Sequence, residues 1–245
     1  ELILKSKKPI IYSGGGVINA GTKASDALTE FTRITNFPIT STLQGLGAFP
    51  GSDPQFLGML GMHGTYEANN AMHECDLMIN VGARFDDRIT GRVDAFSPNS
   101  KKIHIDIDPS SINKIVKVDV AIVGDCLSVL NDMLTTLKNK HSDFCNSNKE
   151  KISDWWKQIN KWREKKSLSY KHDDKLIMPQ YAVERLYELT KNKDSFITTE
   201  VGQHQMWAAQ YYKFDKPNRW MTSGGLGTMG YGLPAAIGTQ IANPG

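Results

Sequence analysis

Pro9-Ile10-Ile11-Tyr12-Ser13-Gly14-Gly15-Gly16 holds the pattern from which the architecture of this chain follows. Residues 9–12 form a short apolar run, typical of a buried strand, and glycines end it. Apolar residues then recur at helical spacing from Ala24 to Ile34. A strand, a glycine turn and a helix make up the repeating unit of a parallel α/β sheet.

The same succession recurs along the first half of the chain. Further strands are predicted at 38–42, 77–81, 102–108 and 120–123, and helices at 68–75 and 127–137. The predicted fold class is therefore α/β, a doubly wound parallel sheet of the Rossmann-like kind. Between these elements, residues 44–64 are rich in glycine and predict a long loop, a feature that is usually functional.

Three regions are expected. Residues 1–138 form the central α/β domain, and residues 139–175 form a linker that is polar up to residue 151 and then carries a Trp-rich helix. The tryptophan stripe of that helix is expected to dock on a domain rather than to stack on a cofactor. Residues 176–245 begin a second α/β domain, with short strands at 196–199 and 219–222.

Composition excludes several classes of protein. The 245 residues have a net charge of +3, 40% hydrophobic and 22% charged residues, as in an ordinary globular protein. The basic run at 161–166 is interrupted by Glu164 and predicts a solvated helix face, so no nucleic-acid partner is expected. No window is long and apolar enough for a membrane span. Cys75, Cys126 and Cys145 are too far apart for a zinc site or a disulfide framework, which favours a reducing, cytosol-like compartment.

Turns with chemical potential follow several predicted strands. Gly14-Gly15-Gly16 could favour phosphate, but the dinucleotide fingerprint fails at Asn19, so a tight packing turn is the alternative. Residues 82–88, Gly-Ala-Arg-Phe-Asp-Asp-Arg, predict an arginine cradle for phosphate or carboxylate, with a surface salt-bridge cluster as the alternative. Asp106 and Asp125 could each accept a ribose hydroxyl or simply start a turn. No histidine spacing predicts a metal site.

Two glycine-rich turns mark the last region. Residues 201–207 read Val-Gly-Gln-His-Gln-Met-Trp, and residues 223–232 read Ser-Gly-Gly-Leu-Gly-Thr-Met-Gly-Tyr-Gly. Each follows a predicted strand, where ligands of parallel sheets bind. The pair predicts one large anionic cofactor held partly by main-chain N–H groups, with plain packing turns as the alternative.

With the segments at 42–47 and 59–64, these turns resemble the acetolactate synthase family, also called acetohydroxyacid synthase, within the thiamine-diphosphate enzymes. The resemblance runs from about Pro9 to Gly245. It implies a transferase that condenses two pyruvates to 2-acetolactate with loss of CO2, or pyruvate with 2-oxobutyrate, in branched-chain amino-acid synthesis. It also implies FAD, thiamine diphosphate and Mg2+ as cofactors, a homodimer or tetramer, a regulatory small subunit, and a cytoplasmic or organellar location.

The resemblance also implies binding residues. The FAD residues would be Gly14, Gly15, Gly16, Thr42, Leu43, Leu60, Gly61, Met62, His63, Gly82, Ala83, Arg84, Asp86, Arg88, Asp106, Ile107, Asp125, Gln205 and Met206. The thiamine-diphosphate residues would be Val201, Gly202, Gln203, His204, Gly227 and Met229. The family glutamate would lie upstream of this chain and the metal motif beyond Gly245, so the chain alone is expected to be inactive.

Two other hypotheses stay open on the sequence. One is a related enzyme such as pyruvate oxidase or glyoxylate carboligase, against which the pair Asp86-Asp87 beside Arg88 argues. The other is a non-catalytic module that binds flavin or nucleotide. An unfinished last domain is also expected to expose apolar surface.

Overall fold

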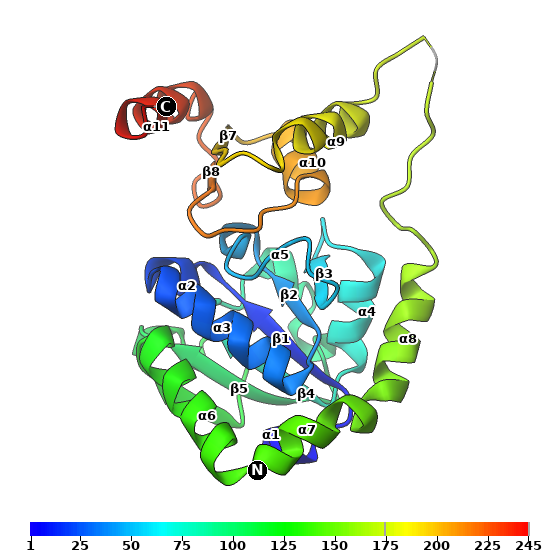
Figure 1. Cartoon of the computed structure of the whole chain (residues 1–245), viewed down its shortest axis with the longest axis vertical. Coiled ribbons are helices and arrows are strands. Elements are labelled where there is room, and N and C mark those ends of the chain that lie inside the picture. The colour runs from blue at the N-terminus through cyan, green and yellow to red at the C-terminus, as the bar shows by residue number, and fades with distance from the viewer. Residues whose placement is uncertain (174, 245) are drawn as a thin grey trace.

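A six-stranded parallel sheet forms the centre of the larger unit (Figure 1). The structure is a computed structural model that describes residues 1–173 and 175–244, without the side chain of Cys145. Predictions that concern Cys145 or Gly245 therefore lie outside the described residues. The strands of the sheet are β1 (Pro9–Ser13), β2 (Ile39–Ser41), β3 (Phe56–Met59), β4 (Leu77–Val81), β5 (Lys101–Asp106) and β6 (Val120–Val123).

The strand order is β3-β2-β1-β4-β5-β6, with every neighbouring pair parallel. This is the order of dinucleotide-binding α/β folds, in which the direction of winding reverses between β1 and β4. Strands β1 and β4 are buried throughout, as expected for central strands covered on both faces. The predicted doubly wound α/β fold is confirmed.

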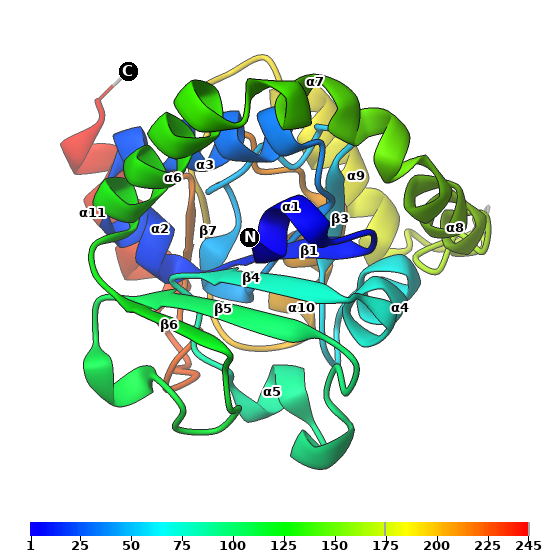
Figure 2. The same ribbon diagram turned by 90° about the horizontal axis from the view of Figure 1, so that it is seen from below.

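Helices cover both faces of this sheet, and the last of them leads into the segment that joins the second unit. They are α1 (Leu2–Lys5), α2 (Gly15–Asn19), α3 (Thr22–Thr35), α4 (Tyr66–Glu74), α5 (Asp87–Thr90), α6 (Cys126–Lys140), α7 (Ser142–Lys151) and α8 (Ser153–Arg163), with single turns at η1 (Leu43–Gly45), η2 (Val93–Ala95) and η3 (Pro109–Ser111). Helices α3 and α6 lie side by side on one face, and α5 lies on the other (Figure 2).

The polar segment at 139–151, predicted to belong to a linker, is mostly helical. It forms α7, which packs on the first unit through Phe144, whose ring lies edge-on to Phe37 at 6.5 Å. Asn148 is buried and donates a hydrogen bond to the carbonyl of Thr35. Tertiary contacts therefore fix a helix that its own composition does not predict.

The tryptophan stripe of α8 docks on the same unit, as predicted. Trp155 and Trp162 are buried, with ring centroids 5.6 Å apart. The indole N–H of Trp155 donates to the carbonyl of Pro9, and that of Trp156 donates to Asn36, both at 2.9 Å.

Residues 44–64 were predicted to be a long loop, and this was wrong at residues 56–59. They contain η1 in part and the edge strand β3, which pairs with β2 through a shifted register. Within β3, Gly58 has a φ of +88°, and a Cβ there would come within 2.7 Å of the Thr65 methyl group. A glycine in a short, irregular edge strand hides the alternation that predicts strands.

The second unit contains two parallel strands and three helices. They are α9 (Pro179–Thr190), β7 (Ile197–Thr199), α10 (Gln203–Tyr211), β8 (Trp220–Thr222) and α11 (Gly232–Ala242). It sits over the segment that follows β2 (Figure 1). There Leu46 and Met59 share a core with Tyr212, Phe214 and others of the second unit.

Predicted apolar exposure is confirmed in the second unit. Leu186 and Leu189 on α9, and Leu233 and Ile241 on α11, are exposed. The boundaries proposed at residues 138 and 175 stay predictions.

Candidate cofactor site

The turn after β4 places two arginines at the carboxyl edge of the sheet. Gly82 begins it with a φ of +62°, and Ala83 and Phe85 are buried beneath it. The ring of Phe85 is held between Tyr12 and His104, at centroid distances of 6.2 and 5.1 Å. With its alternate residues anchored inside, the turn directs the Arg84 side chain, 77% exposed, toward solvent.

The surroundings of Asp86 favour the ionised form of its carboxyl group. Interaction with the Asp87 side chain lowers the pKa of Asp86, and the N–H of Arg88 and the guanidinium groups of Arg84 and Arg88 act in the same direction, against the effect of burial. Asp86 also caps α5 by accepting from the N–H of Arg88 at 3.2 Å. Arg84 approaches Asp86 only at 3.8 Å, so this exposed pair contributes little to stability. The Arg84 guanidinium keeps donors available for an anion.

The three glycines after β1 pack against this turn. A Cβ on Gly14 would overlap the Gly82 carbonyl oxygen, and one on Gly16 would lie 2.7 Å from the Gly82 Cα. The N–H of Gly16 donates to the carbonyl of Gly82 at 2.9 Å. Gly15 faces Gln44 instead. Close packing between the β1 and β4 turns is therefore sufficient to explain Gly14 and Gly16, and their contact with FAD stays a prediction.

A second loop joins the arginine turn. The N–H of Met62 donates to the carbonyl of Arg88 at 3.2 Å, and Gly61 is held through both its N–H and its carbonyl by Asn69. Met62 and His63 are exposed, whereas Leu60 is buried in the core. The structure thus brings Gly61 and Met62 beside Arg88, whereas the side chain of Leu60 is buried and does not line the surface.

Two acids lie farther along the same edge. Asp106 ends β5 and accepts from the N–H of Asp108 at 2.9 Å, and Asp125 caps α6 by accepting from the N–H of Ser128 at 3.1 Å. Each acid therefore starts a turn, as one alternative predicted, and uses one carboxylate oxygen to do so. Beside Asp106, the apolar side chain of Ile107 is 68% exposed.

The segment after β2 links the two units. Thr42 caps η1 by accepting from the N–H of Gly45 at 3.0 Å, and the Leu43 carbonyl accepts from the indole of Trp220 at 3.1 Å. Gln44 reaches the carbonyl of Thr222 at 3.4 Å. Thr42 and Leu43 therefore lie where the first sheet meets β8.

The predicted thiamine-diphosphate residues meet at the carboxyl ends of β7 and β8. Gly202, with a φ of +142°, precedes α10. A Cβ on Gly227 would touch the Val201 methyl group at 3.4 Å. Gln203, His204 and Met229 are exposed around this contact. The two glycine-rich turns are thus side by side, as their sequence positions predict.

Gln205 and Met206 follow on α10, where the family places contacts to FAD. Gln205 is buried, and its amide donates to the Thr222 hydroxyl at 2.6 Å. Met206 is half-buried. The amide of Gln205 therefore already forms a hydrogen bond within the second unit, and its contact with FAD stays a prediction.

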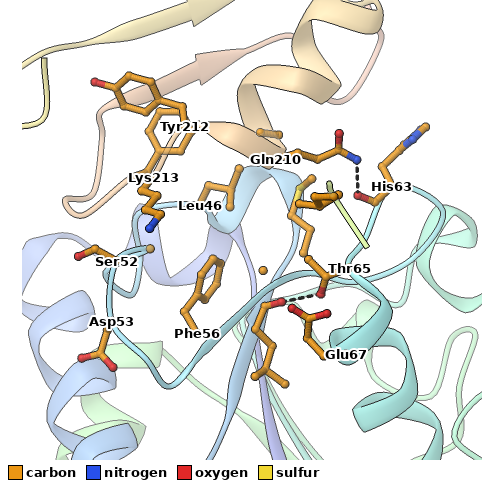
Figure 3. Close-up of a pocket in the computed structure, with 17 residues that line it drawn as sticks. Leu46, Ser52, Asp53, Phe56, His63, Thr65, Glu67, Gln210, Tyr212 and Lys213 are labelled. Atoms are coloured by element: carbon orange, nitrogen blue, oxygen red, sulfur yellow. Dashed lines mark hydrogen bonds between the residues drawn. The ribbon is translucent and has the colours of Figure 1, made fainter. Parts of the chain in front are cut away.

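A cavity of about 270 Å³ lies between β3 and α10 (Figure 3). Phe56 and Thr65 face it, together with Tyr212 and Lys213 of the second unit. Of the predicted cofactor residues only His63 lines it, and its imidazole points away from the centre (Figure 3). The carbonyl of His63 accepts from the amide of Gln210 at 3.0 Å. The cavity is smaller than most ligand pockets and does not coincide with the predicted site.

Other classes of site find no support in the described residues. Within residues 1–173 and 175–244, there is no group of three or more His, Cys, Asp or Glu that could hold a metal ion. In the same part of the chain, no helix has the length and apolar character that crossing a membrane requires.

Three polar residues of the site region were not identified from the sequence. Asn80 and His104 are fully buried under the arginine turn, and Glu200 accepts from the N–H of Gly230 at 2.9 Å. The signal for the first two is a polar residue inside an otherwise apolar buried strand. Glu200 carries no comparable signal, because an acid at a strand end is common.

Comparison with known proteins agrees with this geometry. Residues 1–133 match the family described as thiamine pyrophosphate enzyme, central domain, and residues 200–245 match thiamine pyrophosphate enzyme, C-terminal TPP binding domain. The second match covers both glycine-rich turns and supports thiamine diphosphate as the cofactor there.

Individual relatives match over the whole chain. The acetolactate synthase large subunit of Haemophilus influenzae is 48% identical, and isozyme 3 of Escherichia coli is 49% identical, each over 100% of this chain. The chloroplastic acetolactate synthase of Arabidopsis thaliana is 46% identical over the same span. The chain covers 41%, 42% and 35% of these proteins, respectively, so it spans about two fifths of their length. With a family match over more than half of its residues, the chain belongs to the thiamine pyrophosphate enzymes.

Proposed function

We propose that this chain provides the central and cofactor-binding parts of an acetolactate synthase. Such an enzyme condenses two pyruvates to 2-acetolactate with release of CO2, or pyruvate with 2-oxobutyrate. The whole-chain identity to proteins named acetolactate synthase carries the proposal, because it includes every turn described above. These relatives support this hypothesis rather than a pyruvate oxidase, a glyoxylate carboligase or a non-catalytic module.

The carboxyl edge of the six-stranded sheet fits FAD as a ligand. Its strand order is that of dinucleotide-binding folds, and the arginine turn lies at the β1–β4 reversal where such ligands bind. Arg84 and Arg88 would bind the diphosphate, because guanidinium groups match phosphate oxygens in bidentate geometry. Asp106 and Asp125 would accept hydroxyl hydrogen bonds with the carboxylate oxygen that does not bind a main-chain N–H.

Exposed apolar side chains along that edge support the same assignment. Met62 and Ile107 are 66% and 68% exposed at loops that otherwise carry charge. A bound dinucleotide would remove both from water and gain the free energy of that burial. The edge therefore offers both charged and apolar surface, as a flavin nucleotide requires.

The edge of the β7–β8 pair fits thiamine diphosphate. Gly227 and Gly230 have φ values of +66° and +76°, and no neighbouring atom lies within 4 Å of a Cβ built on Gly230. The turn can therefore present main-chain N–H groups closely to a ligand. When bound, thiamine diphosphate supplies the carbanion stabilisation that decarboxylation of a 2-oxo acid requires. Val201 and Met229 would shield it from water, and the described residues provide no Mg2+ site of their own.

Assembly and location belong to the same proposal. A homodimer or tetramer is implied by the family resemblance, and the exposed apolar residues of α9 and α11 are available for contact with another protein surface. A regulatory small subunit rests on the family resemblance alone. The free, buried thiols of Cys75 and Cys126 support a reducing compartment, such as the cytoplasm or an organelle.

The first test is titration with FAD, followed by flavin fluorescence, alongside 2-acetolactate formation from pyruvate by the complete synthase of which this chain is proposed to be a part. Arg84→Ala and Arg88→Ala should each raise the Kd for FAD by about 10–100-fold, the loss expected for a charge-assisted hydrogen bond. Activity at limiting FAD should fall in parallel. Arg92→Ala is the matched control, because Arg92 is equally exposed and pairs with Asp94 at 2.9 Å. Unchanged FAD affinity in both arginine variants would contradict the cradle.

A further inference from the structure

A row of polar side chains crosses the buried centre of the six-stranded sheet. Tyr12 of β1 pairs with Asn80 of β4, and Asn80 pairs with His104 of β5. Directly paired residues point to the same face of a sheet, and all three are fully buried. Two residues earlier on the same face, Ile10 of β1 pairs with Met78 of β4. The polar pair Tyr12–Asn80 therefore interrupts a face of these two strands that is otherwise apolar.

Asn80 and His104 both hold the main chain of Ala83. The amide of Asn80 donates to the Ala83 carbonyl at 2.8 Å, and its carbonyl oxygen accepts from the Ala83 N–H at 3.1 Å. The Nε2 of His104 lies 3.1 Å from the same carbonyl. A carbonyl oxygen has two lone pairs, so Ala83 accepts both hydrogen bonds. Ala83 directly precedes Arg84, so hydrogen bonds that hold the main chain of Ala83 also hold the start of Arg84.

His104 also reaches the second acidic element of the site. Its Nε2 lies 3.6 Å from the Oδ2 of Asp106, the carboxylate oxygen that does not accept from Asp108. One imidazole nitrogen thus stands between the arginine turn after β4 and the acid that ends β5. Among the described residues, Asn80 and His104 are the two side chains that hydrogen-bond to Ala83, and His104 lies two positions before Asp106 on β5.

The surroundings select one protonation state of this imidazole. Nδ1 is buried, and it has no hydrogen-bond partner in the part of the chain that the structure describes. Burial lowers the pKa of His104, although Asp106 and the Ala83 carbonyl oppose that shift. The neutral ring with its proton on Nε2 satisfies the Ala83 carbonyl and leaves no charge in the core.

We propose that His104 is a positioning residue for the flavin site: the hydrogen bond from its Nε2–H to the Ala83 carbonyl ties the Gly82–Arg88 turn to β5, the strand that Asp106 ends. This rests on the proposed function, because it assigns a role toward FAD. The Asn80 hydrogen bonds fix the turn on β4, and His104 fixes that turn relative to β5. Arg84 and Asp106 are thereby held at a constant separation, which a ligand that contacts both requires.

The test compares three variants of the protein. His104→Leu removes the donor, and His104→Gln keeps an N–H close to the position of Nε2. Thr32→Val is the control, since it removes a buried hydroxyl that donates to Leu28 at 2.7 Å within α3. His104→Leu should weaken FAD binding about tenfold, whereas His104→Gln should stay within about threefold of the unsubstituted protein. Thr32→Val should leave FAD affinity unchanged, and thiamine-diphosphate affinity should not change in any of the three.

Several results would overturn the proposal. They are unchanged FAD affinity in His104→Leu, an equal loss in Thr32→Val, or an equal loss in His104→Gln. A direct readout does not need flavin: nitrogen NMR of histidine-labelled protein should show the His104 proton on Nε2, and a proton on Nδ1 would also overturn it. If His104→Leu does not fold, the glutamine variant and the NMR spectrum decide.

Failure of the proposed function has a different signature. If the unsubstituted protein binds no FAD, the flavin assignment fails, and with it the role of His104 toward flavin. Amide hydrogen exchange at Ala83 and Arg84 then still reports on the turn. Faster exchange in His104→Leu than in His104→Gln would show that the imidazole orders the turn whatever ligand it serves.

Discussion

The turn after β4 and the turn after β8, both predicted to bind a cofactor, differ in how the protein holds them. The turn after β4 is anchored by Phe85, which is 4% exposed, and by main-chain contact with Gly14 and Gly16. In the turn after β8, Leu226 is 96% exposed, and no neighbouring atom lies within 4 Å of a Cβ built on Gly225. Glycine thus permits close packing in the first turn and an open backbone in the second. We infer that the first is preorganised by the fold, whereas the second depends on its ligand.

The largest expected effect comes from removing the apolar anchor of the first turn. Phe85→Ala should lower the free energy of unfolding by about 3–5 kcal/mol, because it deletes a buried ring and leaves a cavity. Leu226→Ala, at the exposed position of the second turn, should change it by less than about 0.5 kcal/mol. Urea unfolding followed by circular dichroism measures both. Similar losses in the two variants would remove the distinction between the turns.

Glycine itself can be tested in the same way. Gly16→Ala would bring a Cβ within 2.7 Å of the Gly82 Cα, where backbone must move, so we expect a loss of about 2–3 kcal/mol. Gly225→Ala meets open space and should be neutral within about 0.5 kcal/mol. Neither glycine has a positive φ, so the comparison isolates packing from backbone strain. A neutral Gly16→Ala would show that the contact between the β1 and β4 turns can relax.

How far the sequence predicts this molecule depends on the range of the interactions involved. Strands β1 and β4 are mostly apolar runs followed by glycine, so local pattern was enough to predict them. The edge strand β3 was missed because Gly58 and a shifted register interrupt its alternation. Helix α7 was missed because Phe144 and Asn148 stabilise it through contacts with residues more than a hundred positions away.

The candidate site shows the same limit. The positions of its turns follow from strand ends, and these could be predicted. The pairing of Asn80 with His104 requires the register of β4 on β5, which a single sequence does not contain. Likewise, only coordinates distinguish glycines that pack, such as Gly16, from those that open a turn, such as Gly225.

In each turn, one N–H is held by the side-chain oxygen of a residue outside the turn, and these two hydrogen bonds should differ in strength. Asn80 holds Ala83 at 3.1 Å in the core, and Glu200 holds Gly230 at 2.9 Å near the surface. Asn80→Ala should lower the free energy of unfolding by about 1–3 kcal/mol, because a buried N–H loses its partner. Glu200→Ala should lower it by about 0.5 kcal/mol or less, because water replaces the carboxylate. Equal losses would mean that the second turn is as well buried in solution as the first.

The smallest effect is a pH dependence that belongs to the first turn alone. Burial lowers the pKa of His104 from its usual 6.5, so below that value the unfolded chain binds more protons than the folded one. The stabilisation is therefore complete above about pH 6.5 and is lost progressively as the pH falls toward the folded-state value. Urea midpoints at about pH 7.5 and about pH 5.5 should differ less in His104→Gln than in the unsubstituted protein, because glutamine does not titrate. An identical pH dependence in the two proteins would mean that the pKa of His104 is the same in the folded and unfolded states, contrary to the lowering that its burial should cause.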